Sequence, residues 1–200
     1  MNPEAAQKYC DLMAQFKLRN YVVYALMYKR LHVGYPATTI ESVYLQFRKM
    51  LELIALGSLV ANKEVFSSMY QNFSRYWNAE LLIKDIERIN PNFYPEPVIQ
   101  KLSDKPGITM DWLSRPDDYL TKADLVKLYQ KCGAIVHSDN PYGSKIDYKF
   151  YGNMMTHWAS RIMNLLNSHC ISLVNDPHLY LVQMGAKNQR PSCGTFARKQ

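Results

Sequence analysis

The stretch RKMLELIALGSLVAN, residues 48–62, decides the fold because it is the most strongly helical segment of the chain. Its apolar residues recur at spacings of three and four and cover more than one face of a helix. Such a helix packs against several neighbours at once. We therefore expect a central, heavily packed helix from about residue 40 to residue 62, with the other elements arranged around it.

Apolar residues also recur at helical spacing in four other windows. They predict helices over residues 4–32 (in two parts, ended by Gly34 and Pro36), 65–89, 121–137 and 147–173. Thr121 begins the sequence TKAD, a variant of the capping box that starts a helix. The predicted fold class is therefore all-α: an antiparallel bundle of about five helices.

Two short β-hairpins are expected as appendages of the bundle. Residues 90–120 hold five of the ten prolines, and VIQKL and ITMDW flank the turn sequence SDKPG. Near the end of the chain, LYLVQM and CGTFARK flank GAKNQRPS in the same way. We expect a helical bundle over residues 1–178, with a proline-rich insertion at about 90–120. Residues 179–200 would be a C-terminal hairpin extension of the same domain.

Composition narrows the classes of function. The chain of 200 residues suits one domain, with 48% hydrophobic and 20% charged residues. It has no glycine-rich phosphate loop, so a nucleotide-binding fold is not indicated. The four cysteines form no CxxC pair, and the longest apolar run is far shorter than the roughly 20 residues that cross a bilayer. We expect a cytoplasmic protein with reduced thiols, no membrane segment, no cofactor and no metal.

The net charge of +7 is concentrated in the C-terminal third. Residues 141–200 carry seven Lys and Arg against two Asp, which leaves an excess of only two for the first 140 residues. A basic region of this kind favours a polyanionic partner such as RNA. The candidate nucleic-acid-binding residues are Lys145, Lys149, Arg161, Lys187 and Arg190.

Glu52 interrupts the apolar run KMLELIAL of the central helix, and Arg48 precedes it on the same helix. They lie four residues apart and therefore share a face of that helix. A carboxylate within a packed helix needs a partner or a purpose. Two interpretations remain open: an ion pair at a partly exposed edge, or part of a functional site.

His137 ends the fourth predicted helix in the sequence KCGAIVHSDNPYG, residues 131–143. Lys131 precedes it by six residues and Asn140 follows by three, so the three side chains are candidates to converge. Histidine suits proton transfer near neutral pH, and a nearby cation stabilises a developing anion. The alternative is a histidine that interacts with the helix dipole, with Asn140 forming the turn.

These two segments, RKMLELIALGSLVAN and CGAIVHSDNPYG, resemble the HEPN superfamily. Its members are small all-α domains, usually homodimers, and many are metal-independent ribonucleases of toxin–antitoxin or defence systems. Their motif is an Arg separated from a His by four to six residues on a late helix, often with an acidic residue from an earlier helix. The resemblance implies that His137 is the motif histidine and that Arg48 and Glu52 occupy the polar positions of the earlier helix.

Lys131 stands where the family motif has Arg, and Cys132 replaces the polar residue that often follows it. Lysine keeps the charge but lacks the planar guanidinium that grips phosphate with two hydrogen bonds. The first functional hypothesis is a ribonuclease with His137, Lys131, Asn140, Glu52 and Arg48 in its site. The alternative is a non-catalytic module that binds nucleic acid or a protein partner through the basic C-terminal third.

The remaining histidines give weaker signals. His157 and Arg161 are four apart on the fifth predicted helix and are candidates to line the same cleft. His169, Cys170 and His178 have a spacing that fits no zinc site.

Overall fold

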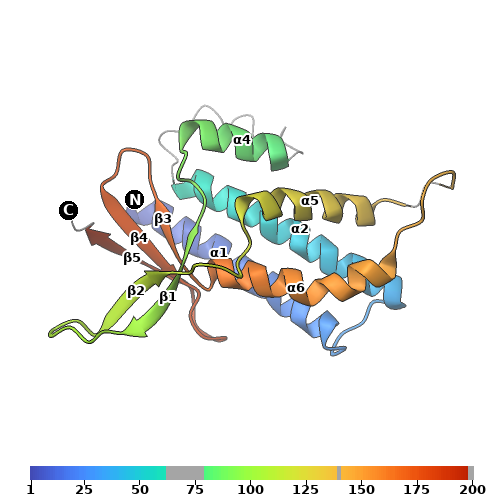
Figure 1. The fold of residues 1–200 in the computed structure, drawn as a ribbon, viewed down its shortest axis with the longest axis horizontal. Helices are drawn as coiled ribbons and strands as arrows, with labels where there is room; N and C mark the ends of the chain where they lie inside the picture. The colour runs from blue at the N-terminus through green and yellow to red at the C-terminus, as the bar shows by residue number, and fades with distance from the viewer. Residues whose placement is uncertain (62–78, 139–140, 198–200) are drawn as a thin grey trace.

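The computed structural model describes residues 1–61, 79–138 and 141–197. The helices lie along one another, and the strands form a sheet at one end of the helical part (Figure 1). The described helices are α1 (Pro3–Met27), α2 (Pro36–Ala61), α4 (Ala79–Ile89), α5 (Lys122–Val136) and α6 (Tyr148–Leu166). Within these residues, no helix has both the length and the apolar character needed to cross a membrane.

The predicted all-α fold class is wrong, because the strands form one five-stranded antiparallel sheet in a mixed α/β fold. The strands are β1 (Glu96–Leu102), β2 (Met110–Ser114), β3 (Ser168–Ser172), β4 (His178–Gln183) and β5 (Ser192–Ala197). Their order across the sheet is β2-β1-β3-β4-β5. Both predicted hairpins are present, but β3 joins them into a single sheet rather than leaving them as separate appendages.

The strand β3 lies inside the segment 147–173 that was predicted to be helical. The helix α6 ends at Leu166, and the chain continues as a strand in which Cys170 and Ile171 are buried. Cys170 pairs with Glu96 of β1 and with Leu181 of β4, so β3 has a partner on each side. A short apolar run fits either a helix or a buried strand by periodicity alone. Pairing with β1, which is far away in the sequence, and with the neighbouring β4 decides between them here.

The first predicted helix differs from α1 in two respects. The structure shows one continuous helix rather than two parts, and it ends at Met27 rather than near residue 32. Lys29 then adopts a left-handed φ of 56°, and the Arg30 amide donates to the Ala25 carbonyl at 2.8 Å. This pattern closes the helix end. Of the predicted helix over residues 65–89, the part up to residue 78 lies outside the described residues, and the rest is α4.

The helix α2 is central, as its sequence predicts. It contacts α1, α4, α5 and α6, and twelve of its residues are buried. Gly57 illustrates how closely it packs, because a Cβ at this position would lie 2.9 Å from Cε2 of Tyr9 on α1. The absence of a side chain at residue 57 therefore lets α1 and α2 approach each other.

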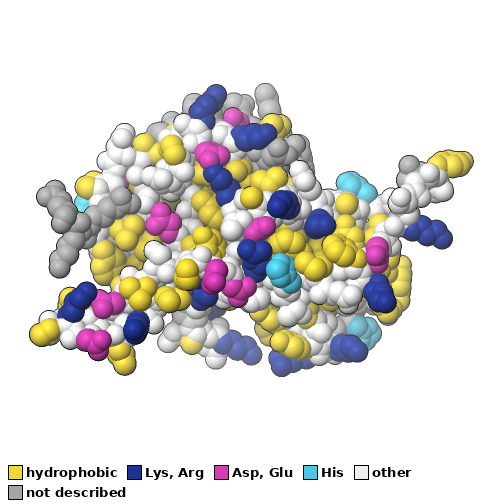
Figure 2. Space-filling view, viewed as in Figure 1, with side chains coloured by type: hydrophobic (Ala, Val, Ile, Leu, Met, Phe, Trp, Pro, Cys, Tyr) yellow, Lys and Arg dark blue, Asp and Glu magenta, His cyan; other side chains and the backbone are white. Residues whose placement is uncertain are grey.

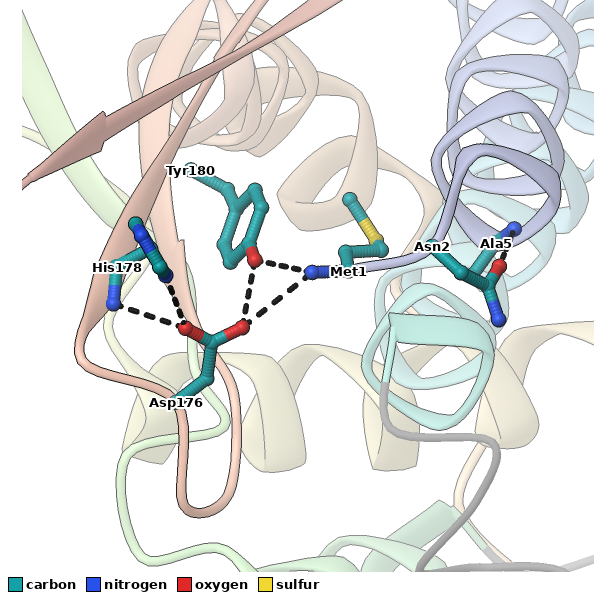
Figure 3. Close-up of polar contacts among 6 residues, drawn as sticks. All are labelled: Met1, Asn2, Ala5, Asp176, His178 and Tyr180. Atoms are coloured by element: carbon teal, nitrogen blue, oxygen red, sulfur yellow. Dashed lines mark hydrogen bonds and ion pairs between the residues drawn. The ribbon is translucent and has the colours of Figure 1, made fainter.

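The start of the chain is fixed against the sheet by Asp176, which precedes β4 (Figure 3). The Asp176 carboxylate accepts hydrogen bonds from the Tyr180 hydroxyl at 2.6 Å and from His178 Nδ1 at 2.7 Å. The amino group of Met1 donates to the Tyr180 hydroxyl and, at 3.3 Å, to Asp176 Oδ2. These hydrogen bonds, that of Tyr180 first, hold the pKa of Asp176 well below its usual range. The contact joins α1 to β4.

Candidate functional site

The polar cluster between α2 and α5 is built around Arg48. Its Nη2 donates to the Tyr129 hydroxyl at 2.6 Å, and its guanidinium carbon lies 4.3 Å from the centre of the Tyr129 ring. Its Nε lies 3.4 Å from Glu52 Oε1. Arg48 thus has contacts on both its own helix and α5, which fix the direction of the guanidinium. Arg48, Glu52 and Tyr129 are called the Arg48 cluster below.

The charges around Arg48 help to hold its guanidinium in place. Glu52 contacts both Arg48 and, at 3.6 Å, Lys49 Nζ, so one carboxylate faces two cations. Burial raises the pKa of Tyr129, Arg48 lowers it, and the hydrogen bond to Glu52 raises it, with a net upward shift. The phenol therefore stays neutral and protonated over the physiological range. The Arg48 side chain keeps 24% of its surface exposed, so its charge is within reach of solvent.

Tyr129, Gly133 and His137 follow one another on α5 at intervals of four residues. Each step turns by about 40°, so Gly133 shares a side of the helix with each of the other two, which are about 80° apart. Arg48 lies against this side: a Cβ on Gly133 would be 3.4 Å from Arg48 Nη1. His137 follows one turn later as the exposed C-cap residue of α5, with extended backbone angles. The start of α5 is fixed by the predicted capping box of Thr121 and Asp124, which the structure confirms.

Lys131 lies on a different side of α5. Its position is about 160° around the helix axis from Tyr129 and Gly133. Its ammonium lies 4.8 Å from the centre of the Phe150 ring on α6, so the residue faces α6. The structure therefore brings Arg48 and Glu52 together against α5, and it separates them from Lys131. The predicted partner Asn140 lies outside the described residues.

Cys132, which replaces a polar residue of the family motif, is fully buried between the helices. Burial is the main reason why its pKa is raised far above the ordinary range, although Arg48 lowers it. The sulfur is therefore a protonated thiol that packs in the core, rather than a nucleophile.

The five basic residues predicted to bind nucleic acid do not form one surface. Arg161 is held at the start of α5: its Nη2 lies 3.1 Å from Asp124 Oδ2, and its Nε donates to the Tyr119 carbonyl at 3.0 Å. Lys145 and Lys149 are exposed at the beginning of α6, whereas Lys187 and Arg190 lie in the β4–β5 turn. In Figure 2, basic side chains lie at separated places, with acidic ones among them.

Hydrophobic side chains gather between α5 and α6 on the face shown in Figure 2. Phe150 is one of the exposed apolar residues of α6, at 41% exposure. His157, a weaker candidate from the sequence, is also on α6, and its ring packs edge-on against Trp158 at 4.9 Å. His169 is fully buried in β3 and contacts Tyr9, so it is a core residue.

Tyr129 is the site residue that sequence reasoning missed. The available signal was its spacing, because Tyr129, Gly133 and His137 repeat every four residues on α5. The sequence alone could not show which residue of α2 contacts this side of α5, because that depends on how the two helices pack.

Within residues 1–61, 79–138 and 141–197, no three His, Cys, Asp or Glu side chains are grouped so as to hold a metal ion.

Comparison with known proteins yields no family model, no curated protein and no solved structure that matches the chain.

Proposed function

We propose that the protein is a ribonuclease similar to those of the HEPN superfamily and that it cleaves RNA without a metal ion, in the cytoplasm. The observation that supports this proposal most strongly is the Arg48 cluster. It fixes a guanidinium against the side of α5 whose next turn carries the exposed His137. A cation from α2 held against α5 and an imidazole at the end of α5 can supply charge stabilisation and proton transfer for RNA cleavage without a metal ion.

In the proposed reaction, His137 accepts the proton of a ribose 2′-hydroxyl as general base. The 2′-oxygen attacks the adjacent phosphorus, and the bond from phosphorus to the 5′-oxygen breaks. The leaving 5′-oxygen takes up a proton from water, the proton held by His137 returns to the solvent, and the products are a 2′,3′-cyclic phosphate and a 5′-hydroxyl. Arg48 stabilises the negative charge that develops on the phosphate oxygens. Glu52 and Tyr129 are positioning residues, because they act through Arg48.

This proposal moves one role relative to the sequence-based hypothesis. The family motif would give the phosphate-binding role to Lys131, but Lys131 packs against Phe150 on the other side of α5. Arg48 has the planar guanidinium that Lys131 lacks, and it lies on the side of α5 that carries His137. We therefore assign the main cationic role to Arg48. Lys131 remains an additional positive charge on the side of α5 that faces α6.

The test is cleavage of a fluorescently labelled single-stranded RNA in the presence of EDTA. His137→Ala should reduce the cleavage rate at least a hundredfold, the size of effect that general acid–base catalysis supplies. The melting temperature should hardly change because His137 is exposed. His157→Ala, an exposed histidine on α6, is the matched control and should cleave at the wild-type rate. Equal loss of activity in both variants would contradict the assignment.

A second candidate function is binding of nucleic acid without cleavage. It is favoured by the position of Lys131, because a family-like cleft would need the motif cation and His137 on one side of α5. The fate of the RNA separates the two hypotheses. A ribonuclease that uses Arg48 and His137 cleaves the RNA in EDTA and should keep its rate in Lys131→Arg, whereas a binding module binds the RNA and leaves it intact.

The resemblance also supports a homodimer in which the two copies of His137 face each other, with an antitoxin-like protein as a further partner. Light scattering of the purified protein would measure the mass of the assembly. A mass of one chain at micromolar concentration would contradict the dimer.

A further inference from the structure

Two segments of the chain contain no acidic residue. Residues 12–40 carry Lys17, Arg19, Lys29 and Arg30, and residues 177–200 carry Lys187, Arg190, Arg198 and Lys199. The two segments are about 140 residues apart in the sequence, yet the described parts of both meet in the structure. Any surface that they form together is positively charged throughout.

Lys17 joins these two segments. Its ammonium, on α1, donates to the backbone carbonyls of Ala186 at 2.7 Å, Gln189 at 2.8 Å and Met184 at 2.9 Å. The Gly185 carbonyl lies farther away, at 3.4 Å. The three shorter contacts match the three hydrogens of an ammonium group. Lys17 therefore holds the β4–β5 turn against α1 and fixes where the turn residue Lys187 is placed.

Three tyrosines are exposed along this part of the molecule, which is unusual for such large side chains. Tyr21 on α1 is 53% exposed, Tyr28 at the C-cap of α1 is 63% exposed, and Tyr35, just before α2, is 63% exposed. Tyr21 and Tyr28 lie seven residues apart, so they are on one side of α1 and about 10 Å from each other along its axis. Tyr24 stacks on Tyr28 with a ring-to-ring distance of 5.9 Å and supports it from one side.

Cations lie directly beside two of these rings. The Lys187 ammonium is 5.6 Å from the centre of the Tyr21 ring, and the Arg30 guanidinium is 5.9 Å from the centre of the Tyr28 ring. Positive groups thus alternate with exposed aromatic rings. Tyr21, Tyr28, Tyr35, Arg30 and Lys187 are called the tyrosine surface below.

The connection that carries Tyr35 is ordered by local hydrogen bonds. The Thr38 hydroxyl accepts from the Tyr35 amide at 3.3 Å, and the Thr39 hydroxyl accepts from the Val33 amide at 3.2 Å. Gly34 adopts a left-handed φ of 66°, which this turn requires. The exposed ring of Tyr35 is therefore attached to a defined backbone beside α1.

We propose that the tyrosine surface is a binding site for single-stranded nucleic acid, separate from the Arg48–His137 site. The bases stack on the rings of Tyr21 and Tyr28, and Arg30 and Lys187 contact the phosphates between them. Stacking of unpaired bases on aromatic rings beside cations is the usual mode of sequence-tolerant single-strand binding. The site does not depend on the proposed ribonuclease activity, because binding here involves no bond cleavage.

Single strands fit this surface better than the alternatives. A duplex keeps its bases stacked on one another, so it cannot use exposed tyrosine rings. An anionic membrane would use the charge and also the exposed leucines nearby, such as Leu18 and Leu31. However, the cations lie close to the rings of Tyr21 and Tyr28, at 5.6 Å and 5.9 Å from the ring centres. A base that displaces a cation from a ring face therefore leaves that cation beside its own phosphate.

The test is fluorescence anisotropy with a labelled oligo(dT), which lacks the 2′-hydroxyl and cannot be cleaved by the proposed reaction. Tyr21→Ala and Tyr28→Ala should each weaken binding about tenfold, within the range found when a stacking aromatic is removed. Tyr28→Phe should bind like the wild type because the ring is kept. Lys187→Ala should reduce the log–log salt slope by about 0.7, the change for one phosphate contact on a single strand.

Tyr142→Ala is the matched control, since Tyr142 is 98% exposed in the α5–α6 connection. It should bind oligo(dT) with wild-type affinity. Equal affinity of Tyr21→Ala, Tyr28→Ala and the wild type would overturn the proposal, as would equal weakening by Tyr142→Ala. Binding to phosphatidylserine vesicles without binding to oligo(dT) would overturn it as well. Oligo(dT) binding that persists in His137→Ala, with or without RNA cleavage by the wild type, supports this site independently of the ribonuclease.

Discussion

Arg48 and Tyr129 form the contact that ties α2 to α5 at the candidate site. The Arg48 Nη2 donates to the Tyr129 hydroxyl at 2.6 Å, and the guanidinium also lies over the tyrosine ring. Glu52 contacts the same guanidinium from its own helix. The cation is therefore held by three kinds of interaction: a hydrogen bond, a ring contact and an ion pair.

Tyr129→Phe should lower the free energy of unfolding by about 1 kcal/mol, because it removes the hydrogen bond and keeps the ring. Arg48→Lys should cost a similar amount, since lysine cannot reach the hydroxyl in the same geometry. The double variant should cost less than the sum of the two, because both remove one shared contact. Urea denaturation of the four proteins measures this coupling, and strict additivity would show that the two residues do not interact.

Gly57→Ala and Gly152→Ala form a matched pair of substitutions within helices. A Cβ at residue 57 would lie 2.9 Å from Cε2 of the buried Tyr9, which has no room to move. Overpacking of this kind costs about 1 to 3 kcal/mol, more than the helix propensity that alanine adds. At residue 152 the nearest atom is Cδ1 of Ile40 at 3.4 Å, the end of a flexible side chain.

We therefore expect a lower melting temperature for Gly57→Ala and an unchanged or higher one for Gly152→Ala. Differential scanning calorimetry provides the comparison. A stabilised Gly57→Ala protein would contradict the close approach of α1 and α2.

The helices were predictable from the sequence because periodicity is a local property. The central position of α2 and the capping box at Thr121 follow from residues that lie next to each other. The sheet was not predictable in the same way. The strand β3 pairs with β1 more than 60 residues earlier in the chain, and no local pattern specifies that pairing. The helical spacing of Ile162, Leu165 and Leu166 was continued to residue 173, beyond the end of α6 at Leu166.

The candidate site was predictable to a similar extent. The shared face of Arg48 and Glu52 follows from their spacing on one helix, and the structure confirms their ion pair. That Arg48 rather than Lys131 lies on the His137 side of α5 depends on how α2 packs against α5. The role of Tyr129 as a partner of Arg48 follows only from that packing.

His169 makes the stability depend on pH. It is fully buried, and its Nδ1 lies 2.9 Å from the Leu166 carbonyl, which can only accept. Nδ1 therefore carries the hydrogen, and Nε2 accepts from the Tyr9 hydroxyl at 2.8 Å. Burial lowers the pKa of His169 from 6.5 to about 4, although the hydrogen bond to Leu166 raises it.

Because the unfolded chain binds this proton more readily, His169 contributes stability above about pH 6.5, and the contribution is lost between pH 6.5 and pH 4. The loss is on the order of 3 kcal/mol at most. Chemical denaturation across this range should show the decline. His169→Gln should flatten that part of the curve, whereas the exposed control His32→Gln should keep it. An unchanged slope in His169→Gln would contradict the role of His169.

Lys17→Met should release the β4–β5 turn from α1, because methionine cannot donate to the carbonyls of Met184, Ala186 and Gln189. Hydrogen exchange at residues 185–190 should become faster, while exchange in the middle of α1 stays slow. Lys8→Met is the control on the same helix, and it should leave the turn unchanged. Equal protection of the turn in Lys17→Met and the wild type would show that the turn is held by other contacts.

The most direct test of the ribonuclease proposal is the chemistry of the product ends. Wild-type protein in EDTA is incubated with a single-stranded RNA and with the DNA of the same sequence, and the products are analysed by mass spectrometry. We predict cleavage of the RNA alone, with 2′,3′-cyclic phosphate and 5′-hydroxyl ends that disappear in His137→Ala. RNA that stays intact in EDTA, or products that carry 5′-phosphate ends, would contradict attack by the 2′-hydroxyl with His137 as its base.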